Sequence, residues 1–198
     1  MSHKIKVEYG PKRISARVAQ LGRQISRDYA KRELDVVVIL DGAFIFASDL
    51  VRHITVPTKC HFVRSEVRQV HVGGHERREI FFSYDPELSA RDLLVVDAVL
   101  HSGVTLDFLI KRLQESRPGS LRVAVLIDKP KDRKVDLKPD YFGFAAASNH
   151  LVGYGLPGAD GLYRNLPYVG SMHKRQGNRS KRASRARRGS AGKARGVR

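Results

Sequence analysis

The sequence is poor in cysteine and in long apolar runs. Cys60 is the single cysteine among 198 residues, which excludes the disulfide-stabilised class of small secreted domains. No apolar run approaches the roughly 20 residues that a membrane-spanning helix requires. Residues 1–6 lack the apolar stretch of a secretion signal. These absences predict a cytoplasmic protein with no membrane partner.

Acidic residues are missing from residues 174–198, which hold 11 Lys or Arg. Of the formal net charge of +17, residues 1–173 keep only +6, from 26 basic and 20 acidic residues. The terminal segment has few apolar side chains to bury, which predicts a disordered basic tail. Such a tail attracts phosphate backbones without reading bases. Two interpretations stay open, namely nonspecific contact with nucleic acid and a solvated segment that aids solubility.

Strand and helix signals alternate along residues 1–173. Apolar residues at helical spacing predict helices over 11–30, 43–53 and 104–114. Runs of β-branched and aliphatic residues are typical of strands covered on both faces. The expected strands are 36–40, 59–67, 80–83, 93–100, 121–127 and 141–144. Residues 69–78, rich in glycine, histidine and charge, are predicted to form a mobile loop.

Repeated alternation of this kind predicts an α/β fold in which a mainly parallel, twisted sheet is flanked by helices on both faces. Ligands of such sheets bind beyond the carboxyl ends of the strands. Three predicted strands end in polar turns, at Asp41-Gly42, at 101–103 and at 128–130. We therefore expect these turns to lie side by side at one edge of the sheet.

The turn after residues 93–100 is the most informative of the three. It leads through Ser102, Gly103, Val104 and Thr105 into a predicted helix. Glycine lets the backbone approach a ligand closely, and the helix N-terminus directs free N–H groups and partial positive charge at it. The segment thus predicts a phosphate site. The ordinary alternative is a helix capped by Ser102, because serine is a frequent capping residue.

Five segments in this order resemble a type I phosphoribosyltransferase of the hypoxanthine-guanine branch: 37–44, 103–106, 126–130, 152–156 and 163–168. The resemblance extends from about Arg13 to Gly170. It implies a phosphoribosyltransferase-like domain over 1–173, with a small hood subdomain formed by about 145–173 and N-terminal residues. It also implies transfer of ribose 5-phosphate from phosphoribosyl pyrophosphate to a purine, with Mg²⁺, in a homodimer or homotetramer.

The resemblance assigns roles to individual residues. Ser102, Gly103, Val104 and Thr105 match the loop that binds the 5′-phosphate. Lysine and arginine donors suit a purine carbonyl and a diphosphate respectively. The remaining matches are Lys129, His150, Leu151 and Val152 for the purine; Asp41, Gly42 and Arg164 for pyrophosphate; Asp97 for ribose; and Asp97 and Asp160 as candidate metal ligands.

The departures from the family pattern fall on the chemistry. Where the family has two adjacent acids and then a catalytic aspartate, this chain has Asp97, Ala98 and His101. Histidine can transfer a proton near neutral pH, which makes His101 the candidate catalytic residue. Asp41 replaces the usual lysine after a cis peptide bond, and a carboxylate there would repel pyrophosphate. The usual Ser-Tyr pair of the flap is absent from 66–68.

Two principal hypotheses follow for the function. The first is a purine phosphoribosyltransferase with a modified active site, which Lys129 and Arg164 favour. The second is a catalytically impaired nucleotide-binding regulator that contacts nucleic acid through its basic tail, which Asp41, Ala98 and His101 favour. A plain RNA-binding protein is a weaker third reading, because it gives the hood and phosphate-loop residues no reason to coexist.

Overall fold

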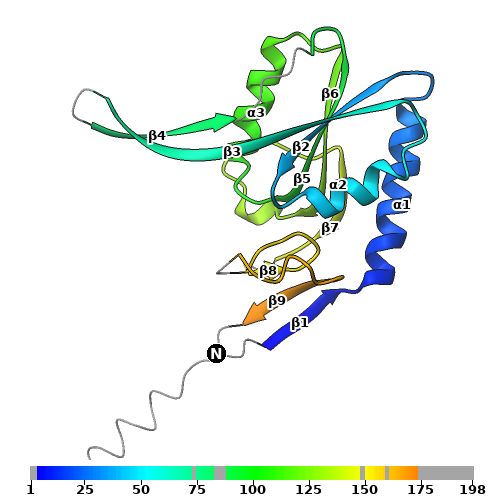
Figure 1. Ribbon diagram of the computed structural model, residues 1–198, viewed down its shortest axis with the longest axis vertical. Helices are drawn as coiled ribbons and strands as arrows, with labels where there is room; N and C mark the ends of the chain where they lie inside the picture. Colours follow the sequence, from blue (N-terminus) through cyan, green and yellow to red (C-terminus); the bar gives the residue numbers. More distant parts are fainter. Residues whose placement is uncertain (1–3, 73–74, 83–87, 148–149, 159–160, 174–198) are drawn as a thin grey trace, which may run out of the picture.

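The computed structural model describes residues 4–72, 75–82, 88–147, 150–158 and 161–173. These residues form two sheets, a six-stranded one of order β4-β3-β2-β5-β6-β7 and a three-stranded one of order β1-β9-β8 (Figure 1). The strands are β1 Lys4–Tyr9, β2 Leu34–Leu40, β3 Thr58–Val72, β4 His75–Phe82, β5 Asp92–Leu100, β6 Ser120–Asp128, β7 Tyr141–Ala145, β8 Leu151–Val152 and β9 Val169–His173. The helices are α1 Pro11–Asp28, α2 Phe44–Val51, α3 Val104–Glu115 and the short 3-10 turn η1 Pro130–Asp132.

Five neighbouring strands of the large sheet, β3, β2, β5, β6 and β7, run parallel. This confirms the predicted α/β class and mainly parallel sheet. Because β2, β5 and β6 are adjacent, their carboxyl ends meet at one edge. The three polar turns that follow them therefore lie side by side, as the sequence predicts.

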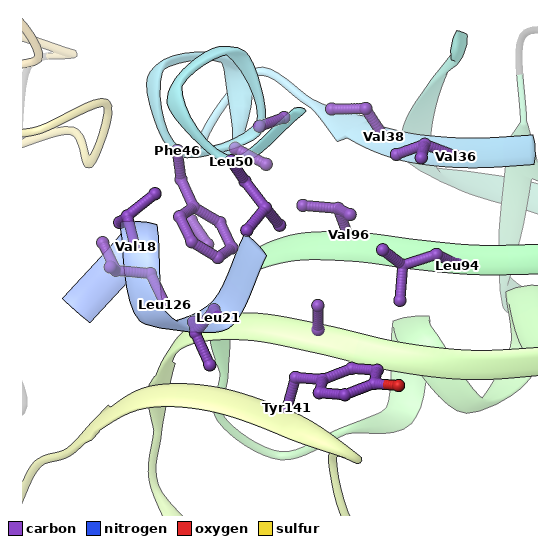
Figure 2. Packing of buried hydrophobic residues seen from close by; sticks show 14 of the residues in the cluster. Val18, Leu21, Val36, Val38, Phe46, Leu50, Leu94, Val96, Leu126 and Tyr141 are labelled. Atoms are coloured by element: carbon purple, nitrogen blue, oxygen red, sulfur yellow. The ribbon is translucent and has the colours of Figure 1, made fainter. Parts of the chain in front are cut away.

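Strand β2 shows why the sheet is covered on both faces. Val36 and Val38 face the apolar cluster that contains α1 and α2, whereas Val37 and Ile39 face the cluster that contains α3. Successive side chains of a strand alternate between faces, so an unbroken apolar run needs helices on both sides. Figure 2 shows Phe46 of α2 among the residues that cover the first face. Burying each such side chain stabilises the fold by about 1.5–3 kcal/mol.

Helix α1 covers the sheet through one apolar stripe. Ile14, Val18, Leu21 and Ile25 recur at helical spacing and are all buried. The helix begins at Pro11, whose fixed φ and missing N–H suit a first helical position, and it ends two residues before the predicted limit. Within the described residues, no helix combines the length and the apolar character needed to cross a bilayer.

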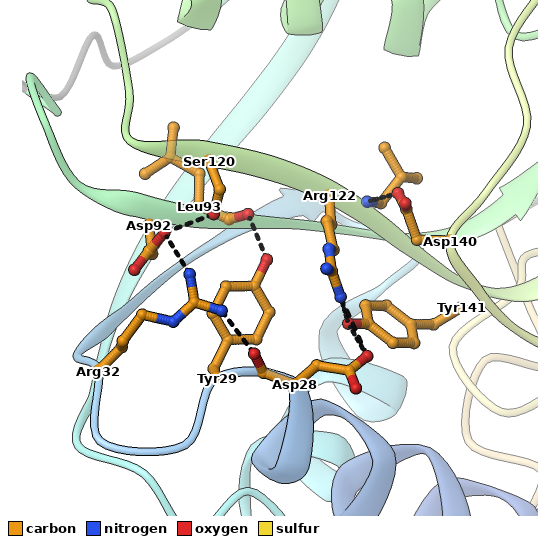
Figure 3. Close-up of polar contacts among 10 residues, drawn as sticks. Asp28, Tyr29, Arg32, Asp92, Leu93, Ser120, Arg122, Asp140 and Tyr141 are labelled. Atoms are coloured by element: carbon orange, nitrogen blue, oxygen red, sulfur yellow. Dashed lines mark hydrogen bonds and ion pairs between the residues drawn. The ribbon is translucent and has the colours of Figure 1, made fainter.

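A polar network fastens the end of α1 to the sheet edge opposite the three turns (Figure 3). The hydroxyl of Tyr141 donates to the Asp28 carboxylate at 2.7 Å, and Arg122 Nη1 lies 3.0 Å from the same carboxylate. Arg32 also pairs with Asp92 at 3.1 Å. Because Asp92 begins β5 and Tyr141 begins β7, these polar groups lie at the amino ends of the strands and connect α1 to the sheet there.

The predicted loop over residues 69–78 is wrong. Strand β3 continues to Val72, and β4 returns antiparallel to it, in register from Ser65↔Phe82 to Val72↔His75. Figure 1 shows this hairpin extending beyond the body of the sheet. The antiparallel pairing depends on backbone hydrogen bonds, which residues of any polarity can form, so the charged composition was misleading. Gly73 and Gly74, between the two strands, lie outside the described residues.

The small sheet brings the two ends of the described chain together. Strand β1 pairs antiparallel with β9, which pairs with β8. Tyr9 connects this sheet to the main body, because its ring stacks on Phe144 at a centroid distance of 4.2 Å and its hydroxyl donates to the Ala145 carbonyl at 2.8 Å. The Arg13 guanidinium lies over both rings. The small sheet is thus held beside the carboxyl end of β7.

Candidate functional site

An open cavity of about 280 Å³ lies at the carboxyl ends of β2 and β5. Its walls come from two of the three predicted turns, together with the first turn of α3. The lining residues are Ile39, Leu40, Gly42, Asp97, Val99, Leu100, His101, Ser102, Gly103, Thr105 and Leu106. The sheet topology therefore gathers residues from both βα units around one solvent-accessible space.

The N-terminus of α3 opens into this cavity without a side-chain cap. Gly103 is the N-cap residue, and no side-chain hydrogen bond caps the helix. Ser102 therefore does not act as the N-cap, which removes the ordinary alternative for this segment. Asp107 in the first turn is paired with Lys111 at 2.8 Å. The first N–H groups of an uncapped helix are free to bind an anion.

Gly103 is required by the backbone at this turn. Its φ of +80° lies in the left-handed region, which costs an L-residue about 1–2 kcal/mol. A Cβ there would also approach Val135 Cγ2 to 2.7 Å. The segment after β6 packs against the turn, because the Lys134 N–H donates to the Ser102 carbonyl at 2.9 Å. The turn before α3 is therefore packed against the segment after β6.

Asp97 is the carboxylate that lines the cavity. Its Oδ1 accepts a hydrogen bond from its neighbour's backbone, the Ala98 N–H, at 2.6 Å. Burial raises the pKa of Asp97 to about 6, although the N–H groups of Ala98 and Val99 oppose the change. The carboxylate is thus oriented by the backbone and offers an acceptor for hydroxyl groups.

His101 contacts a carboxylate on the rim of the cavity. Its Nε2 lies 3.1 Å from Oδ2 of Asp132, which belongs to η1. Lys129, just before η1, is only 4% exposed, and its backbone N–H donates to the Leu100 carbonyl at 3.0 Å. Burial lowers the pKa of Lys129, and the charge of Asp132 opposes this effect. The turn after β6 therefore contacts the turn after β5, although Lys129 does not line the cavity.

The turn after β2 contains a cis peptide bond between Leu40 and Asp41. The Asp41 carboxylate is paired with Arg64, whose Nη2 lies 2.7 Å from Oδ1. Arg64 is next to this turn because it pairs in register with Leu40 in the parallel ladder of β2 and β3. The negative charge that the sequence places here is thus accompanied by a guanidinium.

Arg164 approaches the same turn from the other side. Its Nη1 donates to the Gly155 carbonyl at 2.7 Å, and its own carbonyl accepts from the Gly155 N–H at 2.9 Å. Gly155 contacts the backbone of Gly42 so closely that a Cβ would collide with the Gly42 carbonyl. Arg164 therefore contacts Gly155, which in turn contacts Gly42 of the cavity wall.

The predicted purine residues lie in and beside the small sheet. His150 is exposed, Leu151 is half-buried and Val152 is buried. Leu151 and Val152 form β8, an edge strand, so the backbone groups on its outer side are free of ladder hydrogen bonds within the described residues. Asp160, the second candidate metal ligand, lies outside the described residues.

Known proteins match this chain over most of its length. Residues 9–157 match the sequence profile of the phosphoribosyl transferase domain. The hypoxanthine phosphoribosyltransferase of Salmonella typhimurium is 34% identical over 174 residues, covering 87% of this chain and 97% of that protein. The hypoxanthine-guanine phosphoribosyltransferase of Mycobacterium tuberculosis is 35% identical over 168 residues, covering 82% and 83%. The chain belongs to the phosphoribosyltransferase family, in its hypoxanthine-guanine branch.

The folds agree as well as the sequences. A crystal structure of a hypoxanthine-guanine phosphoribosyltransferase from Bacillus anthracis has a TM-score of 0.76 and 32% identity, covering 87% of this chain and all of that one. A Staphylococcus aureus hypoxanthine phosphoribosyltransferase has a TM-score of 0.77 and 32% identity, covering 85% and 91%. The type I phosphoribosyltransferase fold is thereby shown for this chain.

The site of this phosphoribosyltransferase suits a metal ion only when a substrate brings further ligands. Among the described residues, no three His, Cys, Asp or Glu side chains gather to hold a metal, and Asp97 is the one carboxylate on the cavity wall. Mg²⁺ is commonly held by one or two carboxylates together with substrate phosphates. The donor set fits Mg²⁺ that arrives on a diphosphate.

Two residues of this phosphoribosyltransferase site were missed by sequence reasoning, Asp132 and Arg64. Neither belongs to a recognisable local motif, since each is brought to the site by a different strand from the residue that it contacts. Arg64 lies within the predicted strand over 59–67 and reaches Asp41 through the register of β3 with β2, whereas Asp132 lies in η1 after β6. The pairing order of the strands would have been needed to find them.

Proposed function

We propose that the chain transfers a 5-phosphoribosyl group from phosphoribosyl pyrophosphate to hypoxanthine or guanine. The observation that carries this proposal is the cavity in which the uncapped α3 N-terminus, Asp97 and His101 meet. An anion site, a hydroxyl acceptor and a proton-transfer group at one place are what a sugar-phosphate transfer requires. Relatives at 32–35% identity carry the corresponding names.

Each group has a defined task in this proposal. The amides at the start of α3 and the hydroxyls of Ser102 and Thr105 bind the 5′-phosphate, and Asp97 accepts from the ribose. Lys129 donates to the purine carbonyl while the edge of β8 faces the purine. The full assignment is Ser102, Gly103, Val104 and Thr105 for phosphate, Asp97 for ribose, Asp41, Gly42 and Arg164 for pyrophosphate, and Lys129, His150, Leu151 and Val152 for the purine.

His101 is the proposed catalytic residue. As the purine N9 forms its bond to C1′, the bond from C1′ to the pyrophosphate oxygen breaks and pyrophosphate leaves with the electron pair. His101 accepts the proton that the purine loses. Mg²⁺ held by Asp97 and the diphosphate, with Asp160 as the second candidate ligand, would neutralise charge on the leaving group.

A direct assay tests the proposal. Purified protein with Mg²⁺, phosphoribosyl pyrophosphate and hypoxanthine or guanine should release pyrophosphate and form the nucleotide. Thr105→Ala, which removes a phosphate donor from the cavity wall, should raise the KM for phosphoribosyl pyrophosphate by about tenfold. Thr58→Ala is the matched control, because Thr58 begins β3 at the opposite edge and donates to the Val56 carbonyl. Thr58→Ala should leave kcat and the KM for phosphoribosyl pyrophosphate unchanged.

Nucleotide binding without turnover in the same preparation would overturn this proposal and favour the regulator. Calorimetry with inosine or guanosine monophosphate distinguishes the two, because a regulator binds the nucleotide and yields no pyrophosphate at high protein concentration. Equal effects of Thr105→Ala and Thr58→Ala would show that the start of α3 does not bind the 5′-phosphate.

The remaining proposals concern the molecule as a unit. We propose that residues 1–173 form the catalytic domain, with the small sheet and its loops as the hood, and that 174–198 form a separate basic tail. A cytoplasmic homodimer or homotetramer is the expected state. Phe44 of α2 and Phe62 of β3 are 46% and 55% exposed. Phe62 pairs in register with Val38, whose face α2 covers. Large apolar side chains exposed on one side of the molecule support association. Light scattering of the purified protein measures the assembly.

A further inference from the structure

His101 is paired with a carboxylate from a different βα unit. His101 belongs to the turn after β5, and Asp132 belongs to η1 after β6. The Nε2–Oδ2 distance is 3.1 Å, with 56% of the His101 side chain and 33% of the Asp132 side chain exposed. An imidazole that donates its Nε2–H to a carboxylate keeps Nδ1 as its acceptor.

Backbone and side-chain contacts hold together the two segments that carry His101 and Asp132. The Lys129 N–H donates to the Leu100 carbonyl at 3.0 Å, immediately before His101. Arg133, immediately after Asp132, donates through Nη1 to the His101 carbonyl at 3.1 Å. Arg133 also pairs with Asp128 at the end of β6. These contacts connect the His101 turn to η1 on both sides of the pair.

We propose that Asp132 is a positioning residue that holds His101 in the orientation and tautomer needed to accept the purine proton. The inference rests on the proposed function and deepens it. Asp132 accepts from Nε2–H, and the Nδ1 lone pair takes the ring proton as N9 forms its bond to C1′. The proton then leaves the imidazolium for solvent after pyrophosphate has departed, so no further reactant is required.

The charge of the pair also suits the reaction. A neutral imidazole with an ionised carboxylate carries one negative charge, which favours the positive charge that develops on the sugar during transfer. After His101 accepts the proton, Asp132 stabilises the imidazolium. A lone imidazole would supply neither effect. The other charged groups around His101 are Lys129, Arg133 and Lys134 from the segment after β6, and Asp97 from β5.

Asp132→Asn separates this role from a merely structural one. The amide keeps the shape of the side chain and removes its charge, so we expect kcat to fall on the order of tenfold while the KM for phosphoribosyl pyrophosphate stays unchanged. Asp132→Glu, which keeps the carboxylate, should retain most of the wild-type kcat.

Asp136→Asn is the control, because Asp136 is exposed in the same segment and should leave both kcat and KM unchanged. An active wild type whose kcat does not fall in Asp132→Asn, or in which Asp132→Glu loses as much kcat as Asp132→Asn, overturns this inference alone. A wild type that releases no pyrophosphate overturns the proposed function, and the role of Asp132 in transfer with it.

Discussion

Asp41 lies between Leu40 and Gly42 of the cavity wall, at the position that we propose for the diphosphate of the substrate. Two negative groups at such a position repel each other. The Arg64 guanidinium at 2.7 Å from Asp41 offsets the carboxylate. Both side chains are more than half exposed, so the pair adds little to folding stability. In the proposed site, we therefore expect the pair to affect substrate binding rather than folding.

A double-mutant cycle measures that effect. Arg64→Ala leaves Asp41 uncompensated and should raise the KM for phosphoribosyl pyrophosphate on the order of tenfold, whereas Asp41→Asn should leave it unchanged or lower it. The double variant should bind better than Arg64→Ala alone. Steady-state kinetics at low ionic strength provide the values. Additive effects of the two changes would show that Arg64 does not act by compensating Asp41.

The proposed phosphate loop, residues 102–105, contains one glycine, Gly103, in the left-handed region. Gly103→Ala adds a Cβ at φ +80° that meets Val135, so we expect the protein to lose about 1–2 kcal/mol of stability and kcat/KM to fall more steeply than in Thr105→Ala. Gly10→Ala is the control, because its added Cβ has nothing within 4 Å. Urea denaturation and the transfer assay give both values. Equal stability of the two variants would contradict the argument.

Strands β2 and β3 and the segment before β5 are fastened together at the edge opposite the site. The buried Asp35 carboxylate accepts from His61 Nε2 and from Arg91 Nε, each at 2.6 Å. Burial alone would raise the pKa of Asp35, but the hydrogen bonds from His61 and Arg91 outweigh it and hold the pKa below its ordinary value. The cluster therefore stabilises the sheet only while Asp35 is ionised.

The sign of its pH dependence follows from that lowered pKa. The stability that Asp35 contributes is fully present above its unfolded-state pKa and is lost as the pH falls through the lower folded-state pKa. Asp35→Asn should cost about 1–3 kcal/mol at pH 7, because it removes the buried carboxylate that accepts from His61 and Arg91, although Arg91 keeps its pair with Glu33 at 3.0 Å. The difference from wild type should shrink below about pH 4. Urea denaturation from pH 7 to pH 3 tests this, and a constant difference would refute it.

Over the whole molecule, the charge divides between a domain of +6 and a tail with 11 Lys or Arg. Deletion of residues 174–198 should leave pyrophosphate release unchanged and flatten the salt dependence of any binding to RNA or DNA, because fewer counterions are released. Binding measured from low to moderate salt for both forms supplies the slopes. A variant with the tail arginines replaced by glutamine is the control for length. An unchanged slope would remove the tail from nucleic-acid contact.

Most of the fold could be predicted from local patterns. The unbroken apolar run at Val36–Leu40 and the helical spacing from Ile14 to Ile25 are each contained in one short stretch of sequence, and both elements are found within two residues of their predicted ends. The hairpin over 69–78 could not be predicted in this way, because its composition is that of a loop and its strands are shown only by their backbone pairing. Composition indicates burial more directly than it indicates backbone conformation.

The sequence by itself determined the βα alternation, the glycine turn before α3 and the basic tail, because each depends on neighbouring residues along the chain. The tertiary structure alone decided that Asp132 reaches His101 and that Arg64 reaches Asp41. Those contacts join residues from different βα units and depend on the order and register of parallel strands. Strand pairing is a long-range property, and it sets the electrostatics around the cavity.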